Sequence, residues 1–137
     1  MDSLNSEQRS KTMAKVRSKD TKPELVVRRL VHGMGYRYGL HSNKLPGSPD
    51  LVFPKYKKVI FIHGCFWHRH SDVNCKLARL PKSRIEFWTE KLEGNKTRDF
   101  AKQKELHALG WKHLVIWECQ LANKNLLKSK IKTFLQL

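Results

Sequence analysis

The sequence has no long apolar segment. No run of about eighteen apolar residues occurs, which excludes a membrane-spanning helix. The first twenty residues lack the apolar stretch of a secretory signal. Internal repeats, low-complexity tracts and linkers are also missing from the 137 residues. We therefore expect one cytoplasmic domain over residues 1–137, long enough to bury a core.

Acidic residues are few. Asp and Glu number 12 against 28 Lys and Arg, which leaves a net charge of +16. Such an excess attracts polyanions, and for a chain of this size nucleic acid is the expected partner. An anionic membrane surface is the alternative, but the sequence has no strongly amphipathic basic helix with bulky apolar residues along it.

Cysteine is scarce, with three residues in the chain. Three thiols cannot all pair with one another, and thiols of a cytosolic protein more often bind metal than form disulfides. Together with His70, the cysteines Cys65, Cys75 and Cys119 make a Cys3His set that is typical of structural zinc. The metal would fix a long polar loop that has little apolar support. The alternative is three unconnected buried thiols, because the spacing matches no common zinc-finger pattern.

Apolar periodicity predicts an α/β fold with a single mixed sheet flanked by helices. Helices are expected at 21–35, at 83–109 with a break near Gly94 as an alternative, and at 123–137; strands are expected at 36–40, 50–53, 58–62 and 112–117. Thr21 with Glu24, and Ser83 with Glu86, have capping-box spacing. The continuous apolar strand at 58–62 is expected to be central. Residues 1–20 are expected to form a basic arm or helix that contacts DNA.

A second group of residues fits a metal-dependent nuclease. Asp50 begins an apolar strand, and the next strand ends at His63, with His68 close behind. Carboxylates at strand ends suit hard divalent cations, and a histidine can take a proton from water. Each residue alone has a plainer interpretation: Asp50 as a strand-start residue, Asp99 as a solvated helix charge and Glu24 as a capping residue. The combination of Asp50 with His63 and His68 beside the cysteine-rich loop makes a catalytic role about as favoured as the plainer interpretations.

Aromatic residues provide candidate wedges that could stack on bases. Phe66 and Trp67 are adjacent, so at least one is expected to be exposed. Trp88 lies one helical turn past Ile85 and has core packing as the alternative. Trp111 and Trp117 are expected in the core, whereas three histidines are expected at the surface or partly packed: His41, His107 and His113.

Several blocks resemble the very short patch repair (Vsr) endonucleases. They are residues 49–52, 59–70, 84–88, 110–111 and 115–119, together with Lys91, Asn95, Arg98 and Asp99. The block Gly-Cys-Phe-Trp-His at 64–68 is the most specific, and the match runs in order over roughly residues 8–120. The resemblance implies a restriction-endonuclease-like fold. It also implies a Mg2+-dependent enzyme that nicks the thymine-containing strand at T:G mismatches, which arise when 5-methylcytosine deaminates.

The resemblance further implies roles for individual residues. Asp50 and the main-chain carbonyl of Ile62 would hold magnesium, with His68 as general base supported by Asp99. His63 and Glu24 would complete the catalytic site. Structural zinc would be bound by Cys65, His70, Cys75 and Cys119, and DNA would be contacted by Phe66, Trp67, Trp88, Met13, Val16 and Asn95.

The chain departs from the PD-(D/E)XK nuclease pattern, because Ile60, Phe61 and Ile62 stand where an acidic residue and a lysine are usual. A carbonyl and a histidine would have to replace them. The interval from His70 to Cys75 is also longer than in the family. The expected assembly is a monomer on double-stranded DNA in the bacterial cytoplasm, with repair proteins as further partners. Two alternatives are a zinc-stabilised DNA-binding protein without catalysis and a nuclease with no mismatch requirement.

Overall fold

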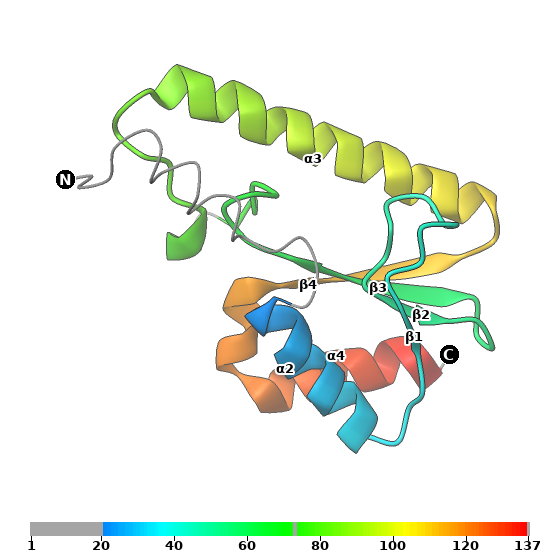
Figure 1. The fold of residues 1–137 in the computed structure, drawn as a ribbon. Coiled ribbons are helices and arrows are strands. Elements are labelled where there is room, and N and C mark those ends of the chain that lie inside the picture. The colour runs from blue at the N-terminus through cyan, green and yellow to red at the C-terminus, as the bar shows by residue number, and fades with distance from the viewer. Residues whose placement is uncertain (1–20, 73, 137) are drawn as a thin grey trace.

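A four-stranded sheet lies between one long helix and a pair of shorter helices (Figure 1). The computed structural model describes residues 21–72 and 74–136, so the expected N-terminal arm, with Met13 and Val16, lies outside the described residues. The elements are α2 (Lys22–Gly33), β1 (Gly39–Leu40), β2 (Leu51–Phe53), β3 (Lys58–His63), η1 (Lys76–Ala78), α3 (Ile85–Ala108), β4 (Lys112–Trp117), η2 (Glu118–Ala122) and α4 (Lys124–Gln136).

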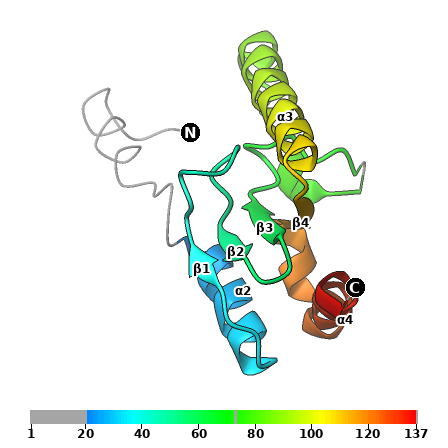
Figure 2. The same ribbon diagram turned by 90° about the vertical axis from the view of Figure 1, so that its right-hand side faces the viewer.

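The sheet is mixed, as the sequence predicts. Its strands lie in the order β1-β2-β3-β4, which Figure 2 shows from the side. β1 and β2 are antiparallel, as are β2 and β3, whereas β3 and β4 are parallel with Ile62 opposite Ile116. The chain crosses from β3 to β4 through the 64–84 loop and α3, so the loop starts at the same end of the sheet where β4 finishes. β3 is therefore central, which confirms the prediction.

Alternate residues of the strands pack against the two helical layers, because neighbouring side chains of a strand point to opposite faces. One face carries the larger core under α2 and α4, and the other packs against α3 (Figure 1). The larger core contains Val27, Val31, Leu51, Phe53, Ile60, Ile62, Ile116, Leu127, Ile131 and Leu135, and the smaller core contains Val52, Val59, Phe61 and Leu106. This alternation places His63 on the α3 side of the sheet, in line with Phe61.

The helix starts differ from one another in their capping. The Thr21 hydroxyl accepts a hydrogen bond from the Glu24 N–H at 3.4 Å, which confirms the predicted start of α2. The capping box expected at 83–86 is wrong: Arg84 is the N-cap in a left-handed conformation with φ of 55°, and no side chain caps the helix. α3 then continues through Gly94 without a break. The first strand is also shorter than predicted, with only two residues.

None of the helices in the described ranges has the length and apolar character that crossing a membrane requires.

Candidate functional site

A single cavity of about 720 Å³ brings together the five residues that the sequence suggested for catalysis. Glu24 comes from the first turn of α2, Asp50 from the residue before β2, His63 from the end of β3, His68 from the following loop and Asp99 from the middle of α3. Five separate segments therefore place acidic and imidazole groups in one cavity at the end of the central strand.

Asp50 is fixed by the main chain of the neighbouring strand. Its Oδ2 accepts a hydrogen bond from the Ile62 N–H at 2.7 Å, and its own N–H donates to the Ile60 carbonyl at 3.1 Å. Burial raises the pKa of Asp50 to about 6, against the opposing effect of the Ile62 hydrogen bond, and the nearby Glu24 raises it further. A buried carboxylate whose charge is opposed by a second acid is a group that a divalent cation would stabilise.

Glu24 faces the cavity although it is almost fully buried, at 3% exposure. Its Oε2 accepts hydrogen bonds from Arg28 at 3.0 Å and from the His41 ring at 2.8 Å. Ligand atoms of Glu24, His41 and Asp50 all lie within 4.8 Å of one another, close enough to hold a metal ion. The side chain of Glu24 thus belongs to this acidic group, and its capping role is confined to the backbone N–H.

Two imidazole rings stack on the other side of the cavity. The rings of His63 and His68 have centroids 3.8 Å apart and planes within 6° of parallel. His68 Nδ1 lies 2.6 Å from Asp99 Oδ2, and this hydrogen bond leaves Nε2 as the nitrogen that can exchange a proton with a ligand. Burial, followed by the proximity of His68, lowers the pKa of His63 to about 3, so this ring stays neutral at physiological pH.

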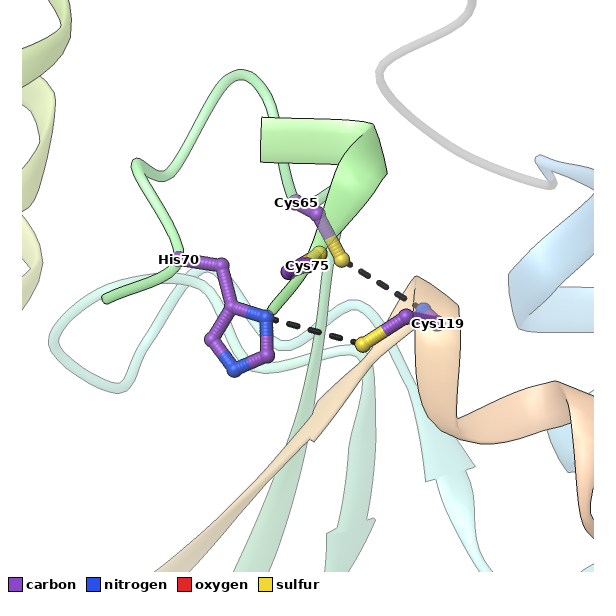
Figure 3. Close-up of side chains that lie close together, drawn as sticks. All are labelled: Cys65, His70, Cys75 and Cys119. Carbon is purple, nitrogen blue, oxygen red and sulfur yellow. Dashed lines mark hydrogen bonds between the residues drawn. The ribbon is translucent and has the colours of Figure 1, made fainter. Parts of the chain in front are cut away.

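The predicted zinc ligands meet at the same end of the sheet (Figure 3). The ligand atoms of Cys65, His70, Cys75 and Cys119 lie within 4.8 Å of one another, and Cys119 Sγ is 3.5 Å from His70 Nδ1. Two ligands on a tetrahedral zinc ion, each at ~2.3 Å, are about 3.8 Å apart, so the four residues fit such an ion. This arrangement excludes the alternative of unconnected thiols.

The thiols of this cluster interact with one another. Burial raises the pKa of Cys65 to about 12. For Cys75 burial acts in the same direction, but hydrogen bonds from Cys65 and from the Ala78 N–H outweigh it and lower the pKa. The ring of His70 stacks on Trp117 with centroids 4.2 Å apart, so Trp117 supports the cluster and is only partly buried.

Aromatic side chains form a partly exposed group beside the cavity. The ring centroids of Phe66, Trp67 and Trp88 lie between 5.2 and 6.1 Å apart. Lys91 Nζ is about 6 Å from the rings of both tryptophans. Asn95 donates a hydrogen bond to the Trp67 carbonyl at 3.0 Å, which fixes the backbone of the loop that carries the first two aromatics. All three rings are half-buried, so neither full exposure nor core packing describes them.

Sequence reasoning missed several residues that line the cavity or touch its acids. His41 is expected at the surface or partly packed, and it is partly buried, but its contact with Glu24 was not foreseen. An antiparallel pairing of the strands at 36–40 and 50–53 could have indicated this position, because it brings a residue just past the first strand next to Asp50. Lys102, Gln103 and Glu118 also line the cavity, and no sequence pattern distinguished them from other exposed polar residues.

Comparison with known proteins identifies the family. A family model described as DNA mismatch endonuclease Vsr matches residues 1–75. The chain is 46% identical over 134 residues to the type II nicking enzyme V.XorIIP of Xanthomonas oryzae, which covers 98% of this chain and 96% of that protein. Identity to the type II nicking enzyme V.NmeAIP of Neisseria meningitidis is 42% over 130 residues, covering 95% and 91%. Identity to the DNA mismatch endonuclease Vsr of Escherichia coli is 40% over 125 residues, covering 91% and 78%. The chain therefore belongs to the Vsr family of DNA mismatch endonucleases.

Proposed function

We propose that this endonuclease nicks the thymine-containing strand at T:G mismatches by Mg2+-dependent hydrolysis, in the repair of deaminated 5-methylcytosine. The observation that carries the proposal is the convergence of Asp50, Glu24, His63, His68 and Asp99 on one cavity. Three carboxylates and two imidazoles in one cavity supply both a cation site and a proton acceptor, which phosphodiester hydrolysis requires. The family membership supports the same reaction class.

Asp50 is the residue that would hold magnesium, with the main-chain carbonyl of Ile62 as a second oxygen ligand. Both residues line the cavity, and the carboxylate already lies 2.7 Å from the Ile62 N–H. Magnesium bound there would neutralise charge that grows on the phosphate and on the departing 3′ oxygen. Glu24, with its ligand atom within 4.8 Å of that of Asp50, adds negative charge that favours a cation.

His68 is the proposed general base. The Asp99 carboxylate at 2.6 Å keeps the proton of the neutral ring on Nδ1, so Nε2 presents a lone pair. As the water oxygen bonds to phosphorus and the bond to the 3′ oxygen breaks, His68 Nε2 takes the proton of the water. Asp99 then stabilises the imidazolium that results, because a carboxylate next to a cation favours the charged form.

His63 has a supporting role in the proposed step. Its ring stacks on His68 at 3.8 Å, and its pKa of about 3, lowered first by burial, keeps it uncharged. A neutral ring does not oppose the positive charge that His68 acquires, whereas a second imidazolium at that distance would. The low pKa of His63 therefore favours proton transfer to its neighbour.

DNA binding would combine electrostatic attraction with insertion of aromatic rings. The net charge of +16 favours contact with phosphates, with strong dependence on salt. Phe66, Trp67 and Trp88 form one half-buried group beside the cavity, where they could enter a base step that a mismatch makes easier to deform. Asn95 would keep the loop of this group in place through the Trp67 carbonyl. A monomer suffices, since a nick in one strand requires no two-fold symmetry.

The four ligands Cys65, His70, Cys75 and Cys119 would hold a structural zinc ion. Their number closes a tetrahedral shell and leaves no position for substrate. The ion would connect the loop after β3 to the end of β4, which are 54 residues apart at Cys65 and Cys119. Its contribution would be to fix the loop that carries His68 and the aromatic residues.

The experiment is a nicking assay on strand-labelled T:G and T:A duplexes, with and without Mg2+, in varied sequence contexts. The proposal expects one nick, in the thymine strand of the T:G duplex, only with Mg2+. Equal nicking of T:A duplex would support a nuclease with no mismatch requirement. Tight binding without nicking under all conditions would support a DNA-binding protein without catalysis, and either result would contradict the proposal.

A further inference from the structure

His41 occupies a position where a histidine is unusual. It follows β1 and has a left-handed backbone conformation with φ of 45°, which a residue other than glycine adopts at an energetic cost. Its N–H donates a hydrogen bond to the Asp50 carbonyl at 3.2 Å and so continues the ladder between β1 and β2. The backbone of His41 is therefore attached to the residue that carries the proposed magnesium ligand.

The side chain of His41 is hydrogen-bonded to a second acid of the cavity, Glu24. Its Nε2 lies 2.8 Å from Glu24 Oε2 and 3.1 Å from Arg28 Nη2, while that Arg28 nitrogen lies 3.0 Å from the same Glu24 oxygen. Arginine is always a donor and a carboxylate always accepts. Nε2 therefore carries hydrogen and donates to Glu24, because a lone pair there would face a carboxylate oxygen at 2.8 Å. Two donors thus converge on one oxygen of Glu24.

We propose that His41 is a positioning residue that sets the separation of the Glu24 and Asp50 carboxylates, with its ring on Glu24 and its backbone on Asp50. This inference rests on the proposed function, since it concerns how the same cavity accepts Mg2+. A cation that demands near-ideal octahedral geometry is sensitive to the separation of its carboxylates. His41 is the described residue that hydrogen-bonds to both acidic residues, and this double attachment gives a reason for keeping a histidine in a left-handed conformation.

Asparagine and glutamine at position 41 make a matched pair for the test. A glutamine amide nitrogen occupies about the place of histidine Nε2 and can donate to Glu24. An asparagine amide is one methylene shorter and cannot reach, although asparagine tolerates positive φ better than most residues. His41→Asn therefore removes the contact with Glu24 without adding backbone strain. His32→Asn, at an exposed position near the other end of α2, controls for the loss of an imidazole.

The measurement is calorimetric titration of the DNA-free protein with MgCl2, together with the Mg2+ dependence of nicking on T:G duplex. His41→Asn should weaken Mg2+ binding about tenfold or more, the effect of losing a hydrogen bond to a charged group. His41→Gln should stay within about threefold of the parent and His32→Asn should equal it. Melting temperatures of all three should lie within about 3 °C of the parent.

Two results would overturn the inference. One is parental Mg2+ affinity in a folded His41→Asn variant, and the other is equal weakening in His41→Gln and His41→Asn, which would point to a general packing effect. If His41→Asn fails to fold, the glutamine variant still decides, because a folded His41→Gln with weakened Mg2+ binding contradicts the proposed contact. A parent protein that binds Mg2+ but never nicks T:G duplex would reject the proposed function and leave the role of His41 to be judged from calorimetry alone.

Discussion

The end of β3 carries two groups of possible metal ligands, and they are built differently. The thiol cluster, defined as Cys65, His70, Cys75 and Cys119, places four ligand atoms within 4.8 Å of one another in a single set. The cavity group, defined as Glu24, His41, Asp50, His63, His68 and Asp99, divides into an acidic set and an imidazole set along one cavity of about 720 Å³. His63 and Cys65 are two residues apart, so the same strand end supplies both groups.

The difference indicates separate roles. In the thiol cluster every ligand would be needed to close the shell of a structural ion. In the cavity group burial opposes charge: it raises the pKa of Asp50 to about 6 and lowers that of His63 to about 3. Strongly shifted groups in a cavity are typical of catalytic sites. We therefore expect the thiol cluster to determine stability and the cavity group to determine rate.

The largest expected effect is the loss of the fold when the thiol cluster is broken. Cys119→Ser should reduce zinc content to near zero and lower the melting temperature by at least about 10 °C, because a structural zinc ion contributes ~10 kcal/mol of binding free energy to folding. Zinc analysis and thermal unfolding measure this directly. Ser71→Ala, an exposed change next to His70, is the control and should have no effect. Unchanged zinc content and melting temperature in Cys119→Ser would contradict a structural role for the thiol cluster.

The second effect should be on rate alone. Asp99→Asn removes the carboxylate that holds His68 Nδ1 at 2.6 Å. Single-turnover nicking should slow by about 10² to 10⁴-fold, the usual range for a disturbed general base, with the melting temperature unchanged. Glu93 lies on the same helix as Asp99, and Glu93→Gln breaks an exposed ion pair with Arg69 of the loop after β3; this control should leave the rate near the parental value. A rate loss of similar size in both variants would show that the rate responds to any change in α3 and does not depend specifically on the hydrogen bond between His68 and Asp99.

The third effect concerns Trp67, which lies between Cys65 and His68 in sequence, lines the cavity and is a member of neither group. Trp67→Ala should weaken binding to T:G duplex by about fivefold to a hundredfold, as expected for the loss of one stacked base. Zinc content should not change. Phe100→Ala, at an aromatic residue of α3 that is 60% exposed, is the control and should bind normally. Fluorescence titration with labelled duplex gives the affinities of both variants. Equal affinities of Trp67→Ala and Phe100→Ala would show that Trp67 does not contribute to DNA binding.

The smallest effect is a pH dependence confined to the cavity group. The pKa of Asp50 is raised to about 6, so its protonated form is favoured in the fold. The contribution of Asp50 to the free energy of unfolding is fully present below the ordinary carboxyl pKa and is lost as pH rises through about 6. Mg2+ binding needs the ionised form, so affinity should fall about tenfold for each pH unit below 6. Calorimetry between pH 5 and pH 7 tests this, and a flat profile would contradict it.

Much of the fold followed from the sequence because its apolar residues have clear periods. β3, β4 and α2 were predicted to within a few residues, since the apolar residues of both strands are contiguous and those of α2 recur at helical spacing. The start of α3 was predicted to within two residues, but its capping was not, because Arg84 takes a left-handed N-cap conformation that no capping pattern signals. The length of the first strand was overestimated, because Tyr36 and Tyr38 pack on the core but lie in irregular backbone before the strand.

The site was predicted less evenly. The thiol cluster could be predicted because it uses every cysteine of the chain. Glu24 was ambiguous, because a capping residue and a cavity acid look the same in sequence, and only the fold shows its Oε2 turned to His41. For His41 the sequence predicts a surface or partly packed position, and its burial is indeed partial, but its contact with Glu24 depends on the register of β1 against β2. Contacts of that kind follow from tertiary pairing, which residue spacing does not encode.

The most direct test is the nicking rate of Asp50→Ala on strand-labelled T:G duplex, measured under single-turnover conditions in protein that retains zinc and the parental melting temperature. The account predicts no nicking above background at any Mg2+ concentration while binding to the duplex persists. Nicking at the parental rate by that folded, zinc-loaded variant would contradict the assignment of the reaction to the cavity group.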